Sequence, residues 1–556
     1  MKKLFVFITV IFVSFNVFAN VRGDQEFIPA GHWVYDDLTG VMLEQGITHF
    51  YDNTPLTVQQ IKLMLLEIDY ENLSEAGKTA YDSINSYFSE NNWGFGSDVF
   101  NFGIELTGAV EGQYKTNDKL DWNFDRRDRS ALIEADVAIQ LSKYVFMGCD
   151  IPVGISKSGR QRNDTYCNIP YNMTLADINF PHKAYFSAGG LLGEKSGVNF
   201  SISTLPRELG RSDISSVILS DSLQDAVHAK LKFFSPYFNY DCSVEMFGIN
   251  RLAYLHNFEF RPHKKISFSI FEGSMPYGPV DLRYLNPFAI FHGIAGWWDY
   301  ENNFTDSYGN KGNDVSYLGL RINWTICKYL RMYANFAMNQ FQMPNEEDKS
   351  IPNAMAYQAG FESYIPVKKG YLHLNLEGAY TDPYFMITEN PNWSWVKKSL
   401  ETCDAADTLY EWIGFKYGPD TLGAKFSAGY SVEKNWSVNL SYLFLARGEL
   451  SRPDFSSCGW TGFSSACNMN NWVYPSTTGY DKYKKGASFV TPSGVAEYTN
   501  VISVSASYWP LSWMCITAMP SYTFSFNNKN QCSVNENGFE FALSLKMFLT
   551  RIGDKK

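Results

Sequence analysis

Long apolar runs are scarce in this chain of 556 residues. One such run opens the sequence, and no stretch of about 20 apolar residues follows it, so a bundle of membrane-spanning helices is excluded. Charged residues make up only 19% of the chain, and the formal net charge is −11. Because nucleic acid attracts basic proteins, this acidic balance predicts that nucleic acid is not a partner.

The short motifs of common enzyme classes are also missing. The sequence contains no HExxH zinc motif, no GxSxG nucleophile motif and no glycine-rich phosphate loop. A lipid-modifying barrel enzyme would need a serine beside a histidine, but spacing singles out no pair among His228, His256, His263, His292 and His373. We therefore expect a protein that is not an enzyme, with no catalytic residue, no metal site and no cofactor.

Cysteine is present but follows no metal-binding pattern. The nine cysteines are an odd number, which leaves at least one unpaired, and their spacings match no zinc motif. Cys458 and Cys467 lie in a segment rich in Gly, Ser and Asn, where they could form a disulfide in an oxidising compartment. Free thiols are the alternative.

The apolar run at the start of the sequence has the form of a signal peptide. Lys2 and Lys3 precede the apolar residues 4–18, and Val-Phe-Ala at 17–19 fits the small-x-small cleavage rule. We predict that residues 1–19 are a signal peptide cleaved after Ala19. The alternative is an N-terminal membrane anchor, for which the run is short.

Aromatic residues are abundant. The chain has 35 Tyr, 42 Phe and 14 Trp, together 16% of its residues, although its mean hydropathy is only −0.24. This combination is typical of a transmembrane β-barrel, because strands that satisfy each other's backbone groups need only one apolar face. The sequence therefore predicts a location in the outer membrane of a diderm bacterium, with outer-membrane lipid as a partner.

From residue 99 onward, apolar and polar residues alternate with the period of a β-strand. Clear runs occur at 99–111, 133–141, 198–203, 227–233, 318–324, 330–339, 372–377, 436–442, 502–508 and 539–549. Their apolar sets are too many and too long for one soluble sandwich. We predict an all-β transmembrane barrel over residues 95–556, with one closed antiparallel sheet whose last strand pairs with its first. About 450 residues accommodate roughly sixteen to twenty strands of this kind.

Long polar segments separate some of these runs. We expect them to be outer loops, and they are residues 153–181, 299–314, 343–355, 384–408 and 449–497. Charged residues at alternate positions of the strands would face the lumen, among them Lys230, Lys232, Arg321, Arg331 and Glu377. These charges either line a selective pore or pair with one another and close it.

Residues 20–94 have a different pattern and predict a helical module on the periplasmic side. Trp33, Leu38, Met42 and Leu43 recur at helical spacing before Gly46, a typical helix stop. Thr57 is the expected N-cap of a second helix with Ile61, Met64 and Leu65 on one face, and a third amphipathic segment covers residues 74–88. We expect this module to pack against the barrel end without carrying chemistry.

One patch combines charged, amide and aromatic residues as sugar-binding sites do. It consists of Phe-Glu-Gly-Ser-Met-Pro-Tyr-Gly at 271–278, Asp-Leu-Arg-Tyr-Leu-Asn-Pro-Phe at 281–288 and His292, with Leu-Gly-Arg-Ser-Asp at 209–213 upstream. Carboxylates and amides bind pairs of hydroxyls, and rings cover the apolar face of a sugar. The alternative is an ordinary barrel turn with aromatic residues at headgroup level.

At these residues the chain resembles the Wzi family of outer-membrane capsule-assembly proteins. The resemblance rests on the stretch 272–292 with its Tyr-Gly and Leu-Asn-Pro elements, on the Gly-Arg and Ile-Leu-Ser elements within 210–220, and on Leu-Glu-Gln-Gly-Ile at 43–47 followed by Thr-Pro-Leu-Thr at 54–57. These elements keep their order over nearly the whole mature chain. The chain departs from the family pattern in its acidic balance, its nine cysteines and its long segment 449–497.

The resemblance implies a barrel of roughly 18 strands, plugged or lidded, with a helical bundle at the periplasmic end. It also implies a lectin-like protein that binds a surface polysaccharide, a capsule or similar glycan, and helps to attach it to the cell. The expected ligand-binding residues are Arg211, Asp213, Glu272, Tyr277, Arg283, Asn286 and His292. The alternative function is an outer-membrane porin or substrate-specific uptake channel.

Overall fold

The computed structural model describes most of the chain. The described residues are 22–89, 93–96, 100–124, 129–155, 166–170, 176–178, 183–224, 226–248, 250–276, 278–291, 315–341, 353–387, 394–400, 408–432, 435–451 and 490–551. The predicted signal peptide, residues 1–19, lies outside them, as do Cys458 and Cys467. Within the described ranges, every helix is too short or too polar to cross a membrane.

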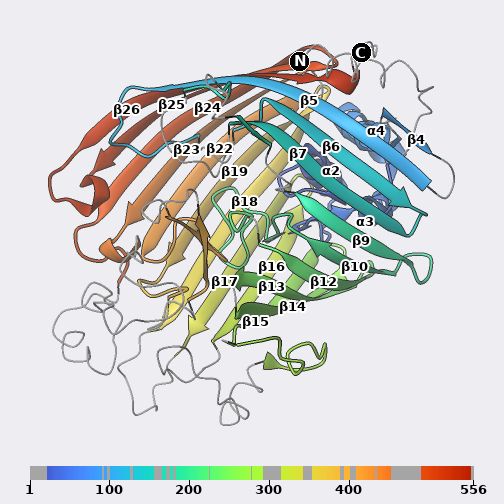
Figure 1. The fold of residues 1–556 in the computed structure, drawn as a ribbon, viewed down its shortest axis with the longest axis horizontal. Coiled ribbons are helices and arrows are strands. Elements are labelled where there is room, and N and C mark those ends of the chain that lie inside the picture. Colours follow the sequence, from blue (N-terminus) through green and yellow to red (C-terminus); the bar gives the residue numbers. More distant parts are fainter. Residues whose placement is uncertain are drawn as a thin grey trace.

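Eighteen antiparallel strands form a closed barrel (Figure 1). The last strand, β26, pairs with the first, β5, and closes the sheet. In chain order the strands are β5 (Phe100–Lys115), β6 (Ile133–Leu141), β7 (Val145–Ile155), β9 (Ala184–Leu191), β10 (Gly197–Ser203), β12 (His228–Phe234), β13 (Phe238–Gly248), β14 (Arg251–His263), β15 (Ile266–Ser274), β16 (Ser316–Cys327), β17 (Leu330–Gln340), β18 (Ala354–Val367), β19 (Gly370–Thr381), β22 (Thr421–Val432), β23 (Trp436–Arg447), β24 (Glu497–Leu511), β25 (Met514–Phe526) and β26 (Glu536–Phe548).

Short strands supplement this ring. β4 (Trp93–Gly96) pairs with β5, and β8 (Ala176–Ile178) pairs with β7. Three small two-stranded sheets lie apart from the barrel sheet. They pair β1 (Phe27–Ile28) with β3 (Leu56–Thr57), β2 (Asn53–Thr54) with β11 (Glu208–Leu209), and β20 (Val396–Leu400) with β21 (Thr408–Trp412).

The alternation of the sequence sets which face of each strand meets lipid. On β26, Phe539 and Leu543 are exposed on the outer face, whereas Glu540 and Ser544 are buried inside. The same arrangement recurs around the barrel, whose outer surface carries exposed Phe, Leu, Ile, Tyr and Trp side chains. The predicted fold class, an all-β transmembrane barrel of roughly 18 strands, is confirmed.

The two ends of the barrel differ in the length of their connections. At one end the strands are joined by short turns, for example residues 264–265, 328–329 and 368–369, while at the other end nearly all connections are long. Short turns mark the periplasmic end of outer-membrane barrels. Segment 384–408 connects β19 with β22 at the end with long connections, and its described part folds into the lumen, where the apolar Trp395 and Val396 are buried in the barrel core.

The N-terminal module contains the three predicted helices, α2 (Trp33–Glu44), α3 (Val58–Leu65) and α4 (Glu75–Ser89). Thr57 caps α3 in a reciprocal capping box with Gln60, so both orphan N–H groups have partners. Gly46 ends α2 with a φ of +70°, which favours glycine because it has no Cβ. The helices share one apolar core, to which Tyr364 and Tyr371 of the barrel wall also belong.

This module packs against the short-turn end of the barrel. The backbone N–H of Thr48 donates to the carbonyl of Lys264 at 2.7 Å, and that of Tyr329 donates to the carbonyl of Leu43 at 2.9 Å. Glu67 accepts two hydrogen bonds from Arg261 of β14, at 2.7 and 3.0 Å. Burial raises the pKa of Glu67, but the hydrogen bonds and charges of His49 and Arg261 outweigh it and lower the pKa to about 2.

One loop of the module enters the lumen. The Asp52 carboxylate accepts a hydrogen bond from Arg321 of β16 and lies 3.9 Å from the guanidinium of Arg331 of β17. Asn53 donates to Asp241 at 2.6 Å and to Glu259 at 2.9 Å. These contacts fix the module to strands on one side of the barrel and neutralise charges that would otherwise be buried alone.

Residues 204–224, which we call the plug segment, cross the interior of the barrel. The segment leaves β10, yet Tyr317 of β16 donates its hydroxyl to the carbonyl of Val217 at 2.7 Å, and Gln358 of β18 donates to that of Ser215 at 2.8 Å. Its apolar side chains pack with those of residues 385–387, 395–396 and 412–415 in a buried core. The described residues therefore fill the part of the lumen that faces β13–β19.

Inward charges pair with the module and with one another. Arg321 pairs with Asp52 of the module, and Arg331 pairs with Glu362. The ammonium of Lys232 lies 3.9 Å from the carboxylate of Asp241. Glu377 accepts hydrogen bonds from Ser212, from the backbone N–H of Asp213 and from Tyr333. Lys230 is also buried, with its ammonium 5.6 Å from the ring centre of Phe27. For Arg321, Arg331, Lys232 and Glu377 the structure favours pairing.

We expect Asp52→Ala to lower the free energy of unfolding by about 3–5 kcal/mol, because the change leaves the Arg321 guanidinium buried without its carboxylate. The measurement is urea unfolding in lipid vesicles, followed by the band shift between folded and unfolded barrel on gels. Glu71→Ala, an exposed acidic residue of the same module, should change stability by less than about 0.5 kcal/mol. Equal effects of both substitutions would contradict the role of Asp52.

Candidate functional site

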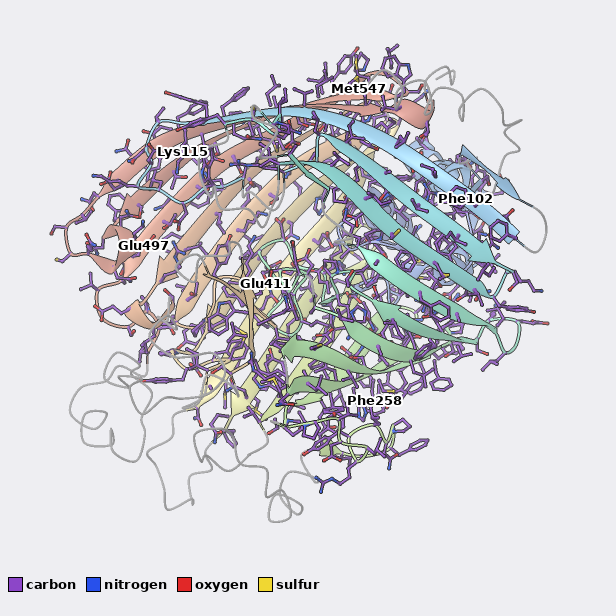
Figure 2. The ribbon with its side chains drawn as sticks, viewed as in Figure 1. Phe102, Lys115, Phe258, Glu411, Glu497 and Met547 are labelled. Carbon is purple, nitrogen blue, oxygen red and sulfur yellow. The ribbon has the colours of Figure 1, made fainter. Side chains whose placement is uncertain are left out.

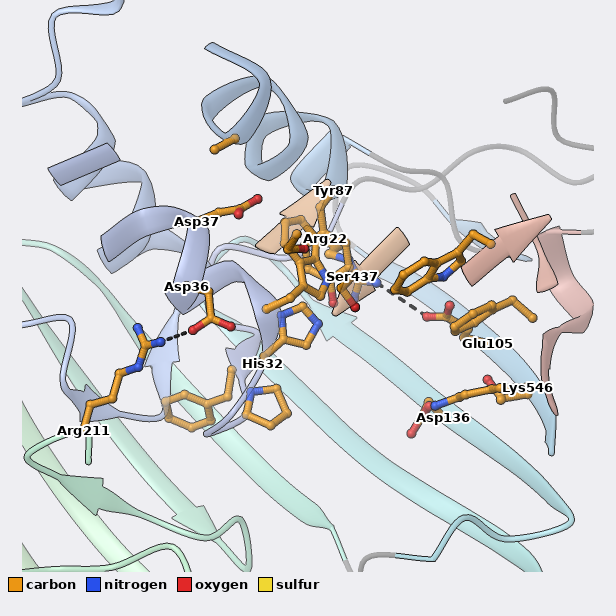
Figure 3. A pocket seen from close by; sticks show the side chains of 18 of the residues that line it. Arg22, His32, Asp36, Asp37, Tyr87, Glu105, Asp136, Arg211, Ser437 and Lys546 are labelled. Carbon is orange, nitrogen blue, oxygen red and sulfur yellow. Dashed lines mark hydrogen bonds and ion pairs between the residues drawn. The ribbon is translucent and has the colours of Figure 1, made fainter. Parts of the chain in front are cut away.

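A cavity of about 830 Å³ lies between the N-terminal module and the barrel wall (Figure 3). Its wall comes from the inner faces of β5, β6, β7, β19, β22 and β23, and its other side from α2, α4 and the residues before them. The cavity therefore occupies the part of the barrel that the plug segment leaves unfilled.

Carboxylates line the wall on three neighbouring strands. Strand pairing places Glu105 of β5 opposite Asp136 of β6, and Asp136 opposite Asp150 of β7. Lys183 offsets part of this negative charge, since its ammonium lies 3.4 Å from Glu134 and its backbone N–H donates to Asp150 at 2.7 Å. Because alternate residues of each strand face the lumen, the acidic residues at these positions lie side by side in one row.

On the module side, a cation and several rings face this row. Arg22 pairs with Glu26, lies 3.5 Å from Glu105, and stands over the Tyr87 ring at 3.9 Å. Burial disfavours its charge, but the carboxylate of Glu26, together with Tyr87 and Glu105, raises the pKa of Arg22 above its usual value. The guanidinium thus stays charged and neutralises acids from both sides of the cavity.

The rings of the module form a cluster at the start of α2. His32 caps this helix by accepting from the backbone N–H of Val34. Its ring lies 5.1 Å from that of Tyr87, and the Trp33 ring lies edge-on to Tyr87 at 5.4 Å. Across the cavity Trp509 also lines the wall. Rings on both sides give the cavity apolar surfaces beside its charged groups.

Arg211 and Asp213, two of the predicted binding residues, line the same cavity from the plug segment. Arg211 donates to the carbonyl of Tyr35 at 2.8 Å and to the hydroxyl of Thr39 at 2.7 Å, and it pairs with Asp36 of α2. Asp213 binds the ammonium of Lys425 at 2.8 Å. Both residues hold the plug segment against the module and the wall, and both reach the cavity surface.

The other predicted residues do not join them. Glu272 is half-buried on the outward side of β15, and Arg283 and Asn286 follow that strand in a turn segment outside the barrel. Arg283 pairs with Asp281 at 2.6 Å, and Asn286 accepts a hydrogen bond from the backbone N–H of Phe288. Tyr277 and His292 lie outside the described residues. The structure therefore separates the predicted set into an inner and an outer group.

Sequence reasoning missed most of the residues that line the cavity. Arg22, Trp33 and Tyr87 belong to a module that was expected to carry no chemistry. Glu105 and Asp136 lie within the alternating runs 99–111 and 133–141, whose pattern predicts polar positions but no binding site. The available signal was the run of acids at alternate positions, Glu134 and Asp136, opposite Glu105 on an adjacent strand. Among the described residues, no group of three or more His, Cys, Asp or Glu side chains is arranged to hold a metal ion.

Comparisons with known proteins identify the fold. Models of known protein families give no match. Curated protein sequences give none either. Among solved structures, the chain is similar to Wzi of Escherichia coli, described as a carbohydrate-binding β-barrel involved in group 1 capsule assembly, with a TM-score of 0.56 and 13% identity over 94% of this chain and 99% of that one.

Two further outer-membrane proteins overlap less. DcaP of Acinetobacter baumannii has a TM-score of 0.33 and 8% identity, covering 82% of this chain and 99% of its own. OprD of Pseudomonas aeruginosa has a TM-score of 0.32 and 8% identity, covering 80% and 95%. The resemblance predicted from short motifs is thus confirmed for the fold, and the closed barrel with its apolar outer face is a protein of the outer membrane of a Gram-negative bacterium.

We expect Arg211→Ala to detach the plug segment from α2 and to lower the free energy of unfolding by roughly 1–3 kcal/mol, since buried acceptors lose their charged donor. Limited proteolysis of detergent-solubilised protein should then cut the module faster than in the wild type. Lys119→Ala removes an exposed ion pair with Glu536 and should cost at most about 1 kcal/mol. An unchanged proteolysis rate for Arg211→Ala would show that the contact does not hold the segment.

Proposed function

We propose that this outer-membrane barrel binds a surface polysaccharide and helps to attach it to the cell, as a binding protein rather than an enzyme. The observation that carries the proposal is the cavity, in which aromatic rings stand beside carboxylates and cations. Sugars present apolar ring faces and pairs of hydroxyls, so such a wall offers a partner for each. The similarity in fold to a barrel described as carbohydrate-binding supports the same class of ligand.

The dimensions of the cavity suit a small segment of polymer. Its volume of about 830 Å³ falls within the range of roughly 300–1,000 Å³ that small-molecule sites span. Trp33 and Tyr87 on one side and Trp509 on the other would cover sugar faces, while Glu105 and Asp136 would accept hydroxyl hydrogen bonds. The outer loops predicted from the sequence would contact further repeats of the polymer.

Individual sugar contacts should be weak. Each hydroxyl exchanges water for protein at a net gain of only about 1 kcal/mol. Attachment would then rest on many repeats of the polymer meeting many copies of the barrel, because linked sites raise the effective concentration of each other. The cell surface supplies both the repeating ligand and the array of proteins.

We expect Trp33→Ala to weaken retention of the bound glycan roughly 2- to 10-fold, the loss that removal of one aromatic contact of about 0.5–1.5 kcal/mol produces. The measurement is binding of the purified barrel to a glycan array, combined with the ratio of cell-attached to released polysaccharide in cells that carry each variant. Trp436→Ala, which removes an exposed tryptophan on the lipid side, should bind as the wild type does.

Deletion of the protein tests the attachment role itself. The released fraction of the polysaccharide should rise in the deletion strain. If attachment is unchanged and the purified barrel retains no glycan, the proposal fails.

A channel is the second candidate, because one side of the lumen is lined by small hydroxyl side chains. Ser437 of β23 and Ser503, Ser505 and Ser507 of β24 are only partly buried at alternate positions of their strands. Such a wall is compatible with water and small solutes. The plug segment and the module reduce the space available on the opposite side.

We expect the purified protein to give no large, stable single-channel currents in planar bilayers, because the plug segment, residues 385–387 and the module pack across the barrel. The control is the same preparation after Arg211→Ala, which should increase brief openings if the plug segment is what limits conduction. Large, stable currents from the wild type would favour a porin or an uptake channel instead.

A further inference from the structure

Part of the outer barrel surface is covered. On β15 and β16, outward side chains are exposed as lipid-facing residues should be, for example Phe268 at 39%. On β13 and β14, however, the outward Tyr240, Tyr254 and His256 are buried, the last two at 1% and 2%. Their neighbours in sequence, such as Leu255 and Asp241, point inward, so something outside the barrel must cover these three residues.

Residues 278–291, which we call the outer flap, provide this cover. They follow β15 at the end with long connections and fold back along the outside of the sheet, where Figure 1 shows the green segment beside β14 and β15. Tyr284 stacks on Tyr254 at 5.1 Å, and Phe291 lies over His256 at 4.1 Å. Tyr240 donates its hydroxyl to the carbonyl of Pro287 at 2.7 Å. Figure 2 labels Phe258 of β14 at this edge of the barrel.

Many backbone N–H groups of the outer flap have partners within the flap or on the barrel. Four of them donate to a carbonyl three residues earlier: those of Tyr284, Leu285, Asn286 and Ala289. The N–H of Asp281 donates to the hydroxyl of Tyr254, that of Arg283 to the Asp281 carboxylate, and that of Phe288 to the amide oxygen of Asn286. A segment in hydrocarbon needs such internal partners, because no water is present to replace them.

The charges of the outer flap are matched in the same way. The Arg283 guanidinium donates to both oxygens of the Asp281 carboxylate, from Nε at 3.0 and 2.9 Å and from Nη2 at 2.6 Å. This two-pronged pair leaves no net charge on the described flap and is the geometry that holds best when water is scarce.

Apart from Asn286, the large exposed side chains of the flap are apolar. Phe288 is 92% exposed, Leu282 77% and Ile290 70%, and Val280 and Leu285 are exposed as well. A loop in water would carry polar residues at such positions. These side chains instead continue the apolar surface that the outward faces of β15 and β16 present to lipid, including Ile270 and Leu320.

We propose that the outer flap is embedded in the bilayer and contacts the hydrocarbon chains of the lipids, forming a second layer outside the barrel wall. It shields His256, which strand pairing places opposite Glu272 on the outward face. Two ionisable residues there would be costly against bare lipid. The inference is independent of the polysaccharide proposal, since it concerns the outer wall and not the lumen.

Photo-crosslinking tests this placement directly. Phe288 is replaced by the photoreactive p-benzoylphenylalanine, the full-length protein is reconstituted in phosphatidylcholine vesicles, and the irradiated peptides are analysed by mass spectrometry. Because the Phe288 side chain is almost fully exposed, the substitution should not disturb folding. The same replacement at Ile290 provides a second position.

Two matched positions calibrate the yield. Phe524 is exposed on the outward face of β25 and defines the lipid level, whereas the side chain of Asp118, 81% exposed in a connection between strands, defines the aqueous level. We expect lipid adducts at Phe288 and Ile290 within about 2-fold of Phe524 and at least 10-fold above Asp118. Yields at the Asp118 level would overturn the proposal, and so would crosslinks to a second copy of the chain in place of lipid.

Discussion

The need to satisfy every backbone hydrogen bond without water governs this structure. In hydrocarbon, a sheet can meet that need only by closing on itself, and the pairing of β26 with β5 does so. In the closed barrel only one face of each strand contacts lipid and must be apolar. A sequence of low mean hydropathy can therefore span the membrane. The polar faces all converge on one interior, and the contents of the lumen follow from this.

An interior with so many polar side chains is stable only if they find partners. The N-terminal module and the plug segment supply them: Asp52 meets Arg321, Arg211 meets Asp36, and Glu377 binds the backbone of Asp213. Where these two elements leave space beside the wall, the inward acids of β5, β6 and β7 border a cavity. The same inward polar faces thus both hold the plug segment and the module in the lumen and line the cavity. Around the cavity, these groups are also accessible to a ligand.

The sequence predicted the local structure well, because periodicity reports directly on which side chains share a face. The strands, the cap at Thr57 and the stop at Gly46 all carry short-range signals, and the closing pair followed from the need to leave no free sheet edge. The candidate site could be predicted only in part. Arg211 and Asp213 do reach the cavity, but Glu272 and Arg283, placed with them by their chemistry, lie on the other side of the wall. Alternation shows which residues of a strand face opposite sides of the sheet, but it does not show which loop folds inward. Nor does it reveal distant contacts, such as the one between Asp52 and Arg321, which are 269 residues apart in the sequence.

The contacts of the loop that carries Asp52 and Asn53 have a consequence for the order of assembly. This loop is among the first parts of the chain to be synthesised, yet its partners Asp241, Glu259, Arg321 and Arg331 belong to strands made much later. Until those strands are in place, its polar side chains have only water as a partner. The N-terminal helices can therefore dock only after the middle strands have been aligned. The part of the polypeptide that is synthesised first thus reaches its final position late in folding.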